Sequence, residues 1–171
     1  MKGSKALFLS LLLGLSPLGS AYSKDKVTMA SEVPFERALS VPNNIRVECN
    51  LNNKLHDYIQ SQLEMNDVEV VSVEDIAKAK GRILDVKISD ARGWGGSGWS
   101  GPKFMELSGT LKENGKKTGS FTAGDHSIGG GFSGFVFKGT CYIFDVIAQE
   151  IAKDIGVWYA NGHAVGARLG K

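Results

Sequence analysis

The chain has 171 residues, a length that suits one domain, and it carries 20 Lys and Arg residues against 18 Asp and Glu. Lys2 and Lys5 lie in an amino-terminal segment that we expect to be removed, which leaves 18 basic and 18 acidic residues. This balance excludes an electrostatic argument for a nucleic-acid partner, because such binding depends on a strongly basic patch or stripe.

Residues 1–23 are expected to form an export signal. Two lysines precede a nearly unbroken apolar run over residues 6–13, Pro17 and Gly19 interrupt it, and Ala21-Tyr22-Ser23 has the small residues of a cleavage site. A permanent membrane span takes roughly 20 apolar residues. Because this run is shorter and no later stretch is comparable, we expect no transmembrane segment. The mature protein is therefore expected to be periplasmic or secreted, where disulfides persist.

The first part of the mature chain is predicted to give a lead-in, a strand and a helix. Residues 24–42 are mixed and polar with two prolines, which indicates an extended lead-in. Apolar and charged residues alternate over 45–49, which predicts a half-buried strand. Asn50 can cap a helix from Leu51 to the Asn66-Asp67 pair, with apolar residues at helical spacing.

The next two elements are predicted to be a strand and a short helix. The β-branched run over 68–73 is typical of a strand. Ser72 and Asp75 have the spacing of a capping box, which would open a short helix through Lys80 that Gly81 closes.

Three further strands are predicted before the last helix. Apolar residues alternate with polar ones over 84–89, and the apolar residues over 105–111 share one face. Asn114-Gly115 predicts a hairpin that returns as a strand over 117–123. This return strand has few apolar residues, so we expect it at a sheet edge.

A long helix is predicted from Thr140, as its cap, to about Tyr159, because apolar residues recur there at alternating spacings of three and four. These elements predict one α+β domain over 43–160, with a loose tail over 161–171. We expect a mainly antiparallel sheet of about four to five strands, a helix after the first strand, and the long helix packed on one face.

Cys49 and Cys141, the only cysteines, are predicted to form a structural disulfide. One ends the predicted first strand and the other lies in the first turn of the long helix, so in an α+β sandwich they can face each other. The alternative is two separately buried thiols, which an oxidising compartment disfavours. A redox-active pair is not expected without the spacing Cys-x-x-Cys.

Glycine, with 22 residues, gathers in two segments, 93–101 and 124–139. Both match G-x-G-x-x-G, but neither has the strand, turn and helix of a dinucleotide site, so we expect no cofactor. The aromatic residues of these loops either fold back as lids over the core or form an exposed binding loop for a protein partner. The predicted binding loop consists of Trp94, Trp99, Phe132 and Phe135.

No catalytic or metal-binding residue is predicted. His56 lies on the polar face of the first helix and His163 lies in the tail. His126 stands between Asp125 and Ser127, but adjacent side chains rarely converge into a triad. No spacing of His, Cys and Asp matches a zinc site. Two carboxylate pairs could serve a hydrolase, although solvation is the expected role: Asp85 with Asp90, and Glu74 with Asp75.

Several motifs, spread over most of the mature chain, carry a resemblance to known proteins. They are Cys49 before a helix, Ala77 and Ala79 ahead of Leu84-x-Val86-x-Ile88, Gly119-Ser120-Phe121, Gly139-Thr140-Cys141, and Asp154-Ile155 with Trp158. The pattern resembles a group of small exported bacterial α+β proteins of unknown function. The order of elements is more distantly similar to the TolB amino-terminal and curli-secretion lipoprotein folds. That resemblance implies a role in envelope assembly or secretion and brings no catalytic residues.

The sequence therefore favours a non-enzymatic periplasmic binding or accessory protein, which acts through protein–protein contacts in the cell envelope. A narrower alternative is a periplasmic immunity protein or an inhibitor of a secreted toxin. A third is a cell-wall or peptide hydrolase that uses His126 or a carboxylate pair. We expect an envelope or secreted protein as the partner, and no nucleic acid.

Overall fold

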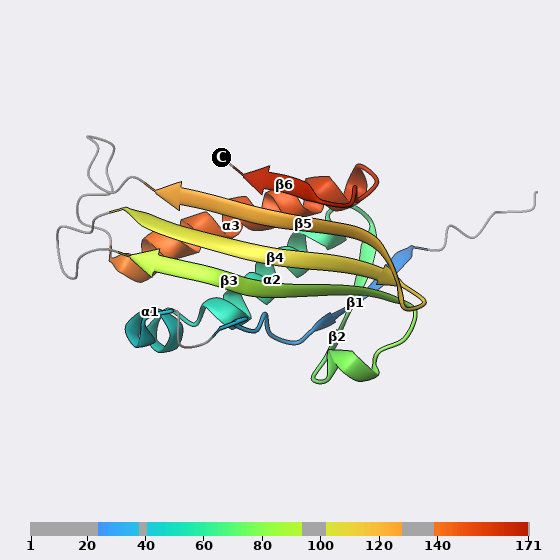
Figure 1. Cartoon of the computed structure of the whole chain (residues 1–171), viewed down its shortest axis with the longest axis horizontal. Coiled ribbons are helices and arrows are strands. Elements are labelled where there is room, and N and C mark those ends of the chain that lie inside the picture. Colours follow the sequence, from blue (N-terminus) through green and yellow to red (C-terminus); the bar gives the residue numbers. More distant parts are fainter. Residues whose placement is uncertain (1–23, 38–40, 94–101, 128–138, 171) are drawn as a thin grey trace, which may run out of the picture.

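The computed structural model describes residues 24–37, 41–93, 102–127 and 139–170 (Figure 1). The strands in these ranges are β1 (Asp25–Ala30), β2 (Val68–Val73), β3 (Arg82–Gly93), β4 (Lys103–Glu113), β5 (Lys116–Ser127) and β6 (Ala167–Gly170). The helices are α1 (Asn43–Glu48), α2 (Leu51–Glu64) and α3 (Thr140–Ala160), with a short 3-10 helix, η2 (Ile76–Lys78). None of these helices is both long and apolar enough to cross a membrane within the described ranges.

The strands form one mixed sheet in the order β2-β1-β3-β4-β5-β6. β3, β4 and β5 form an antiparallel meander, and Asn114 and Gly115 both have positive φ in the tight turn between β4 and β5. β1 lies parallel between β2 and β3, and β6 lies parallel to β5. The α+β class is confirmed. The expected mainly antiparallel sheet of about four to five strands is only partly right, because the described sheet is mixed and has 6 strands. Only β3, β4 and β5 pair antiparallel with one another.

Two strands come from segments that we expected to be a lead-in over 24–42 and a loose tail over 161–171. β1 places Val27 and Met29 in the core. β6 pairs with β5, so β5 is not the edge strand that we expected. Each segment is short and its alternation brief, so the local pattern is weak. Pairing with strands distant in sequence is what stabilises them.

The predicted strand over 45–49 is wrong, because residues 43–48 form the helix α1. Ile45 and Cys49 are buried, while Val47 is 65% exposed. Positions four apart share one face of a helix, so the alternation that suggested a strand also fits one helical turn. Pro42 precedes the helix, and its carbonyl accepts hydrogen bonds from the backbone N–H groups of Ile45 and Arg46.

The predicted caps differ in their outcome. Asp75 accepts a hydrogen bond from the backbone of Ala77 at 3.1 Å and so caps η2, which is shorter than predicted. Asn50 instead adopts the left-handed conformation, with φ of 49°, between α1 and α2. α3 begins at Thr140 with Gly139 at its cap position and no side-chain cap.

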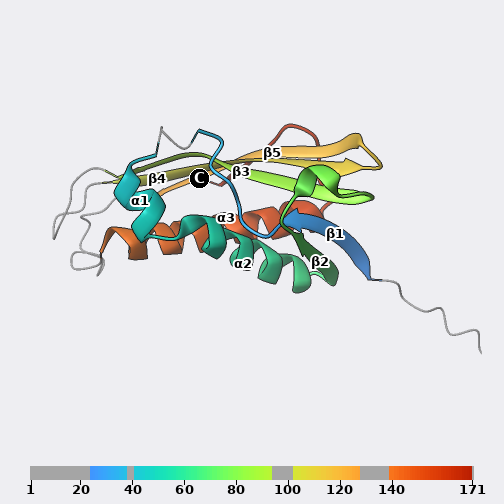
Figure 2. The same cartoon turned by 90° about the horizontal axis from the view of Figure 1, so that it is seen from below.

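The hydrophobic core lies between the sheet and the pair of helices α2 and α3 (Figure 2). Alternate residues of the central strands are buried on the helix side, among them Leu84, Val86, Met105 and Leu107. α3 buries the stripe that its sequence predicted: Phe144, Ile147, Ala148, Ile151, Ile155 and Trp158. The opposite face of the sheet, which we call the open face, carries the polar residues that alternate with the buried residues of the central strands.

One polar cluster ties β1 to the rest of the fold. Asp25 accepts hydrogen bonds from Arg82 of β3 and, at 3.0 Å, from the hydroxyl of Tyr159 at the end of α3. Arg82 also lies 3.1 Å from the carboxylate of Glu113. Burial raises the pKa of Tyr159 to about 12, so the hydroxyl stays protonated even at alkaline pH and continues to donate its hydrogen bond to Asp25.

Candidate binding site

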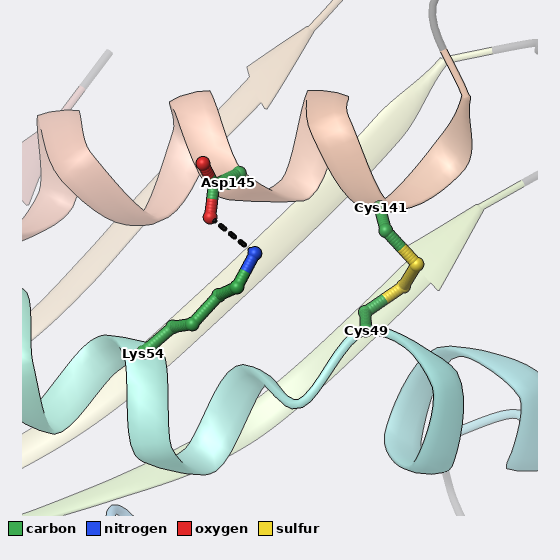
Figure 3. The surroundings of a disulfide bond; sticks show 4 residues. All are labelled: Cys49, Lys54, Cys141 and Asp145. Carbon is green, nitrogen blue, oxygen red and sulfur yellow. Dashed lines mark hydrogen bonds and ion pairs between the residues drawn. A yellow bond between two sulfur atoms is a disulfide. The ribbon is translucent and has the colours of Figure 1, made fainter.

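Cys49 and Cys141 form a disulfide, with their Cα atoms 4.9 Å apart (Figure 3). Cys49 lies directly after α1, and Cys141 lies in the first turn of α3. The bond therefore joins the α1–α2 corner to the start of the long helix. The bond thus holds the helices together as one layer on one side of the sheet.

An ion pair lies one helical turn along α3 from the disulfide (Figure 3). Asp145 accepts hydrogen bonds from the Lys54 ammonium and the Tyr58 hydroxyl of α2, each at 2.8 Å. Burial alone would raise the pKa of the Asp145 carboxyl, but these two hydrogen bonds outweigh it and hold the pKa below its usual value. A covalent and an ionic contact thus fix α2 against α3.

Asp145→Asn is expected to lower the free energy of unfolding at pH 7 by about 1 kcal/mol, because Lys54 is 40% exposed and water screens the pair. The folded-state pKa of Asp145 lies below the unfolded value of about 3.9, so its stabilisation is present above that pH. It is lost as the pH falls through the folded-state pKa. Urea titrations at pH 7 and at successively lower pH measure this difference.

The matched control for that prediction is Asp57→Asn, on the exposed face of the same helix α2. It should change stability little at any pH. A difference between wild type and Asp145→Asn that stays constant down to about pH 2 would contradict the predicted role of the carboxylate.

His56 is buried, so its expected position on the polar face of α2 is wrong. β2 packs against that side of the helix, and the His56 Nε2 atom lies 3.0 Å from the Ser72 hydroxyl and 3.1 Å from Gln60. A nucleophilic serine needs a histidine beside it, and a third group that orients the histidine ring. The Nδ1 atom of His56 has no hydrogen-bond partner, so this third group is missing among the described residues.

The other histidines lie on separate elements. His126 is exposed near the end of β5, and His163, in the turn after α3, lies beside Trp158 with ring centroids 6.2 Å apart. Within the described ranges, no group of three or more His, Cys, Asp or Glu residues could hold a metal ion.

Three of the four carboxylates considered as hydrolase acids contact other groups. Asp85 lies 4.0 Å from the ammonium of Lys87, and Asp90 lies 2.6 Å from the guanidinium of Arg92. Asp75 caps η2 and also contacts Lys78 at 2.8 Å.

The predicted aromatic binding loop, Trp94, Trp99, Phe132 and Phe135, lies outside the described residues. The described residues that flank it are neighbours at one end of the sheet, where Lys103 pairs with Gly93 on one side and with Ser127 on the other. Lys103 is fully buried there, and burial lowers its pKa.

A pocket of about 740 Å³ lies on the open face of the sheet, near the β4–β5 turn. The connection between β2 and β3, which contains η2, forms one wall, and β3 and β4 form the floor. Ile76 and Ile83 give it an apolar part, and small residues such as Ala30 and Ala77 leave the space open.

The charged residues of this pocket are mainly lysines. Lys80 follows η2, Lys87 comes from β3 and Lys112 comes from β4, whereas Asp85 is the one acidic residue among the described residues that line it. The sequence analysis did not single out these lysines. Their shared face follows from the alternation along β3 and β4, but their proximity depends on the strand register.

Comparison with known proteins adds a relationship in fold. No family model and no curated protein matches the chain. A Xanthomonas campestris protein of the family DUF330 shares 10% identity over 84% of this chain and 90% of its own, with a TM-score of 0.55. At this identity the likeness shows a shared fold, which is consistent with the predicted resemblance to small bacterial proteins. The similarity to TolB stays a prediction.

Two other solved structures have lower TM-scores. A PelC dodecamer from Paraburkholderia phytofirmans shares 13% identity over 75% of this chain and 86% of its own, with a TM-score of 0.47. A minor lipoprotein from Acinetobacter baumannii shares 12% identity over 81% of this chain and 92% of its own, with a TM-score of 0.46.

Proposed function

We propose that this chain is an exported, non-enzymatic binding protein that acts through protein–protein contacts in the cell envelope. The Cys49–Cys141 disulfide is compatible with an envelope or secreted location, because such bonds persist in oxidising compartments. The observation that carries the binding role is the pocket on the open face. It joins an apolar part, formed by Ile76 and Ile83, to several cationic side chains, as sites for specific partners commonly do.

Photo-crosslinking in the native envelope tests this proposal. A benzophenone amino acid is placed at Thr110, on the open face beside the pocket, and separately at the exposed Glu150 of α3. Circular dichroism confirms that both variants fold. Adducts with a defined envelope or secreted protein are expected from Thr110 and not from Glu150, because α3 lies on the opposite side of the sheet.

Equal adducts from both positions, or none from either, would contradict the proposal. The identity of the captured protein also decides between the two binding hypotheses. A secreted toxin would favour the narrower role of an immunity protein or inhibitor, whereas an envelope component would favour an accessory role.

A further inference from the structure

Three elements bring lysines to the open-face pocket. Lys80 is exposed after η2, Lys87 is 45% exposed on β3, and Lys112 lies on β4. Only Lys87 has an ion-pair partner in the described part of the chain, Asp85 at the long distance of 4.0 Å. The pocket therefore presents positive charge that the fold leaves largely uncompensated.

A second observation, independent of the pocket, concerns the sheet register. Lys112 lies directly opposite Lys117 in the β4–β5 pair. Like charges at such positions destabilise a sheet. Glu113 is the adjacent acid in the chain, but Arg82 holds its carboxylate at 3.1 Å. Two lysines thus occupy opposite positions beside the pocket, where an anionic ligand would balance their charge.

The composition of the lining distinguishes among anionic ligands. Among the described residues that line the pocket, none is aromatic, so bases of a nucleic acid would have no stacking platform. The site is recessed and includes Asp85, which disfavours a flat anionic membrane surface. Carboxylates together with an aliphatic group match the lysines and the apolar part formed by Ile76 and Ile83.

We infer that this pocket binds an acidic segment of the partner protein, with carboxylates at Lys80, Lys87 and Lys112 and an aliphatic side chain on the floor. This ligand class rests on the proposed binding function. The small residues Ala30 and Ala77 leave room for the aliphatic side chain.

Fluorescence anisotropy with a labelled peptide of alternating Glu and Leu tests the inference, and the same peptide with Gln in place of Glu is its uncharged match. The acidic peptide should bind more tightly, and added salt should weaken it. Lys87→Gln with Lys112→Gln should reduce affinity about three- to tenfold, as expected for two partly exposed charge contacts. Amide resonances of Ala77 and Gly115 should shift on binding, and those of α3 should not.

The control variant, Lys24→Gln with Lys153→Gln, removes the same charge from exposed positions outside the pocket and should bind as wild type does. Equal binding of both peptides, or equal losses in both variants, would overturn the inference. Binding to phosphatidylglycerol vesicles that depends on Lys87 and Lys112, without peptide binding, would instead assign the pocket to a membrane surface.

The two proposals fail in different ways. Adducts from Thr110 together with no preference for the acidic peptide would reject this ligand class and leave the binding function standing. Binding of the acidic peptide without crosslinked adducts would reject the envelope partner and support the ligand class inferred for the pocket.

Discussion

Replacing Cys49 or Cys141 by serine is expected to lower the free energy of unfolding by about 4–5 kcal/mol. The bond spans 92 residues, and in the chain-entropy model a closed loop of that size restricts the unfolded ensemble by this amount. A typical domain has a net stability of roughly 5–15 kcal/mol, so either variant should retain little net stability. Guanidinium titrations of the oxidised wild type and of each variant measure the loss, with reductant added only to the variants to prevent intermolecular bonds.

A double-mutant cycle supplies the control for this prediction. The variant that lacks both cysteines should be little less stable than either single variant, because both substitutions remove the same bond. Reduced wild-type protein should behave like the variants. If the two losses add, the stability of this region derives from separate packing of the two side chains.

Gly109→Ala is expected to destabilise the protein by about 3 kcal/mol, the upper part of the range for overpacked cores. Gly109 lies opposite Phe121 in the β4–β5 pair, and an added Cβ would lie 2.1 Å from the Phe121 ring. That ring cannot move away easily, because it is 97% buried and packs edge-on against Trp158 with centroids 4.8 Å apart. Thermal and urea unfolding measure the effect.

Gly124→Ala is the matched control, since its Cβ would meet no atom closer than 3.6 Å on the neighbouring strand. It should change stability by a few tenths of a kcal/mol, within the range for surface substitutions. Phe121→Leu should recover part of the loss when combined with Gly109→Ala, because it removes the ring that clashes. A Gly109→Ala protein as stable as wild type would show that the ring does not fill this space.

The elements that the sequence predicted well have strong local signals. The apolar stripe of α3 extends from Phe144 to Trp158, and Asn114-Gly115 marks the β4–β5 turn directly. α1 was mistaken for a strand because Ile45 and Cys49 satisfy both periodicities over so few residues. β1 and β6 depend on partners far along the chain, which local periodicity does not reveal.

The candidate site was harder to predict than the fold. Lys80, Lys87 and Lys112 lie on three separate segments of a chain with balanced charge, so the sequence does not reveal that the strand register brings them together. The disulfide was predictable because the chain has only two cysteines and the compartment expected from the sequence favours their oxidation. The binding loop around Trp94 and Phe132 stays a prediction.

The position of β1 determines the order in which the sheet can form. This strand comes first among the described elements, yet Lys26 lies opposite Glu69, 43 residues later, and Thr28 pairs with the still later Ile83. The centre of the sheet therefore cannot close until β3 has been synthesised. Such distant parallel pairing makes folding slow. On the proposal that the chain is exported, slow folding would keep it extended during translocation. The bond between Cys49 and Cys141, which are 92 residues apart, would then form after passage.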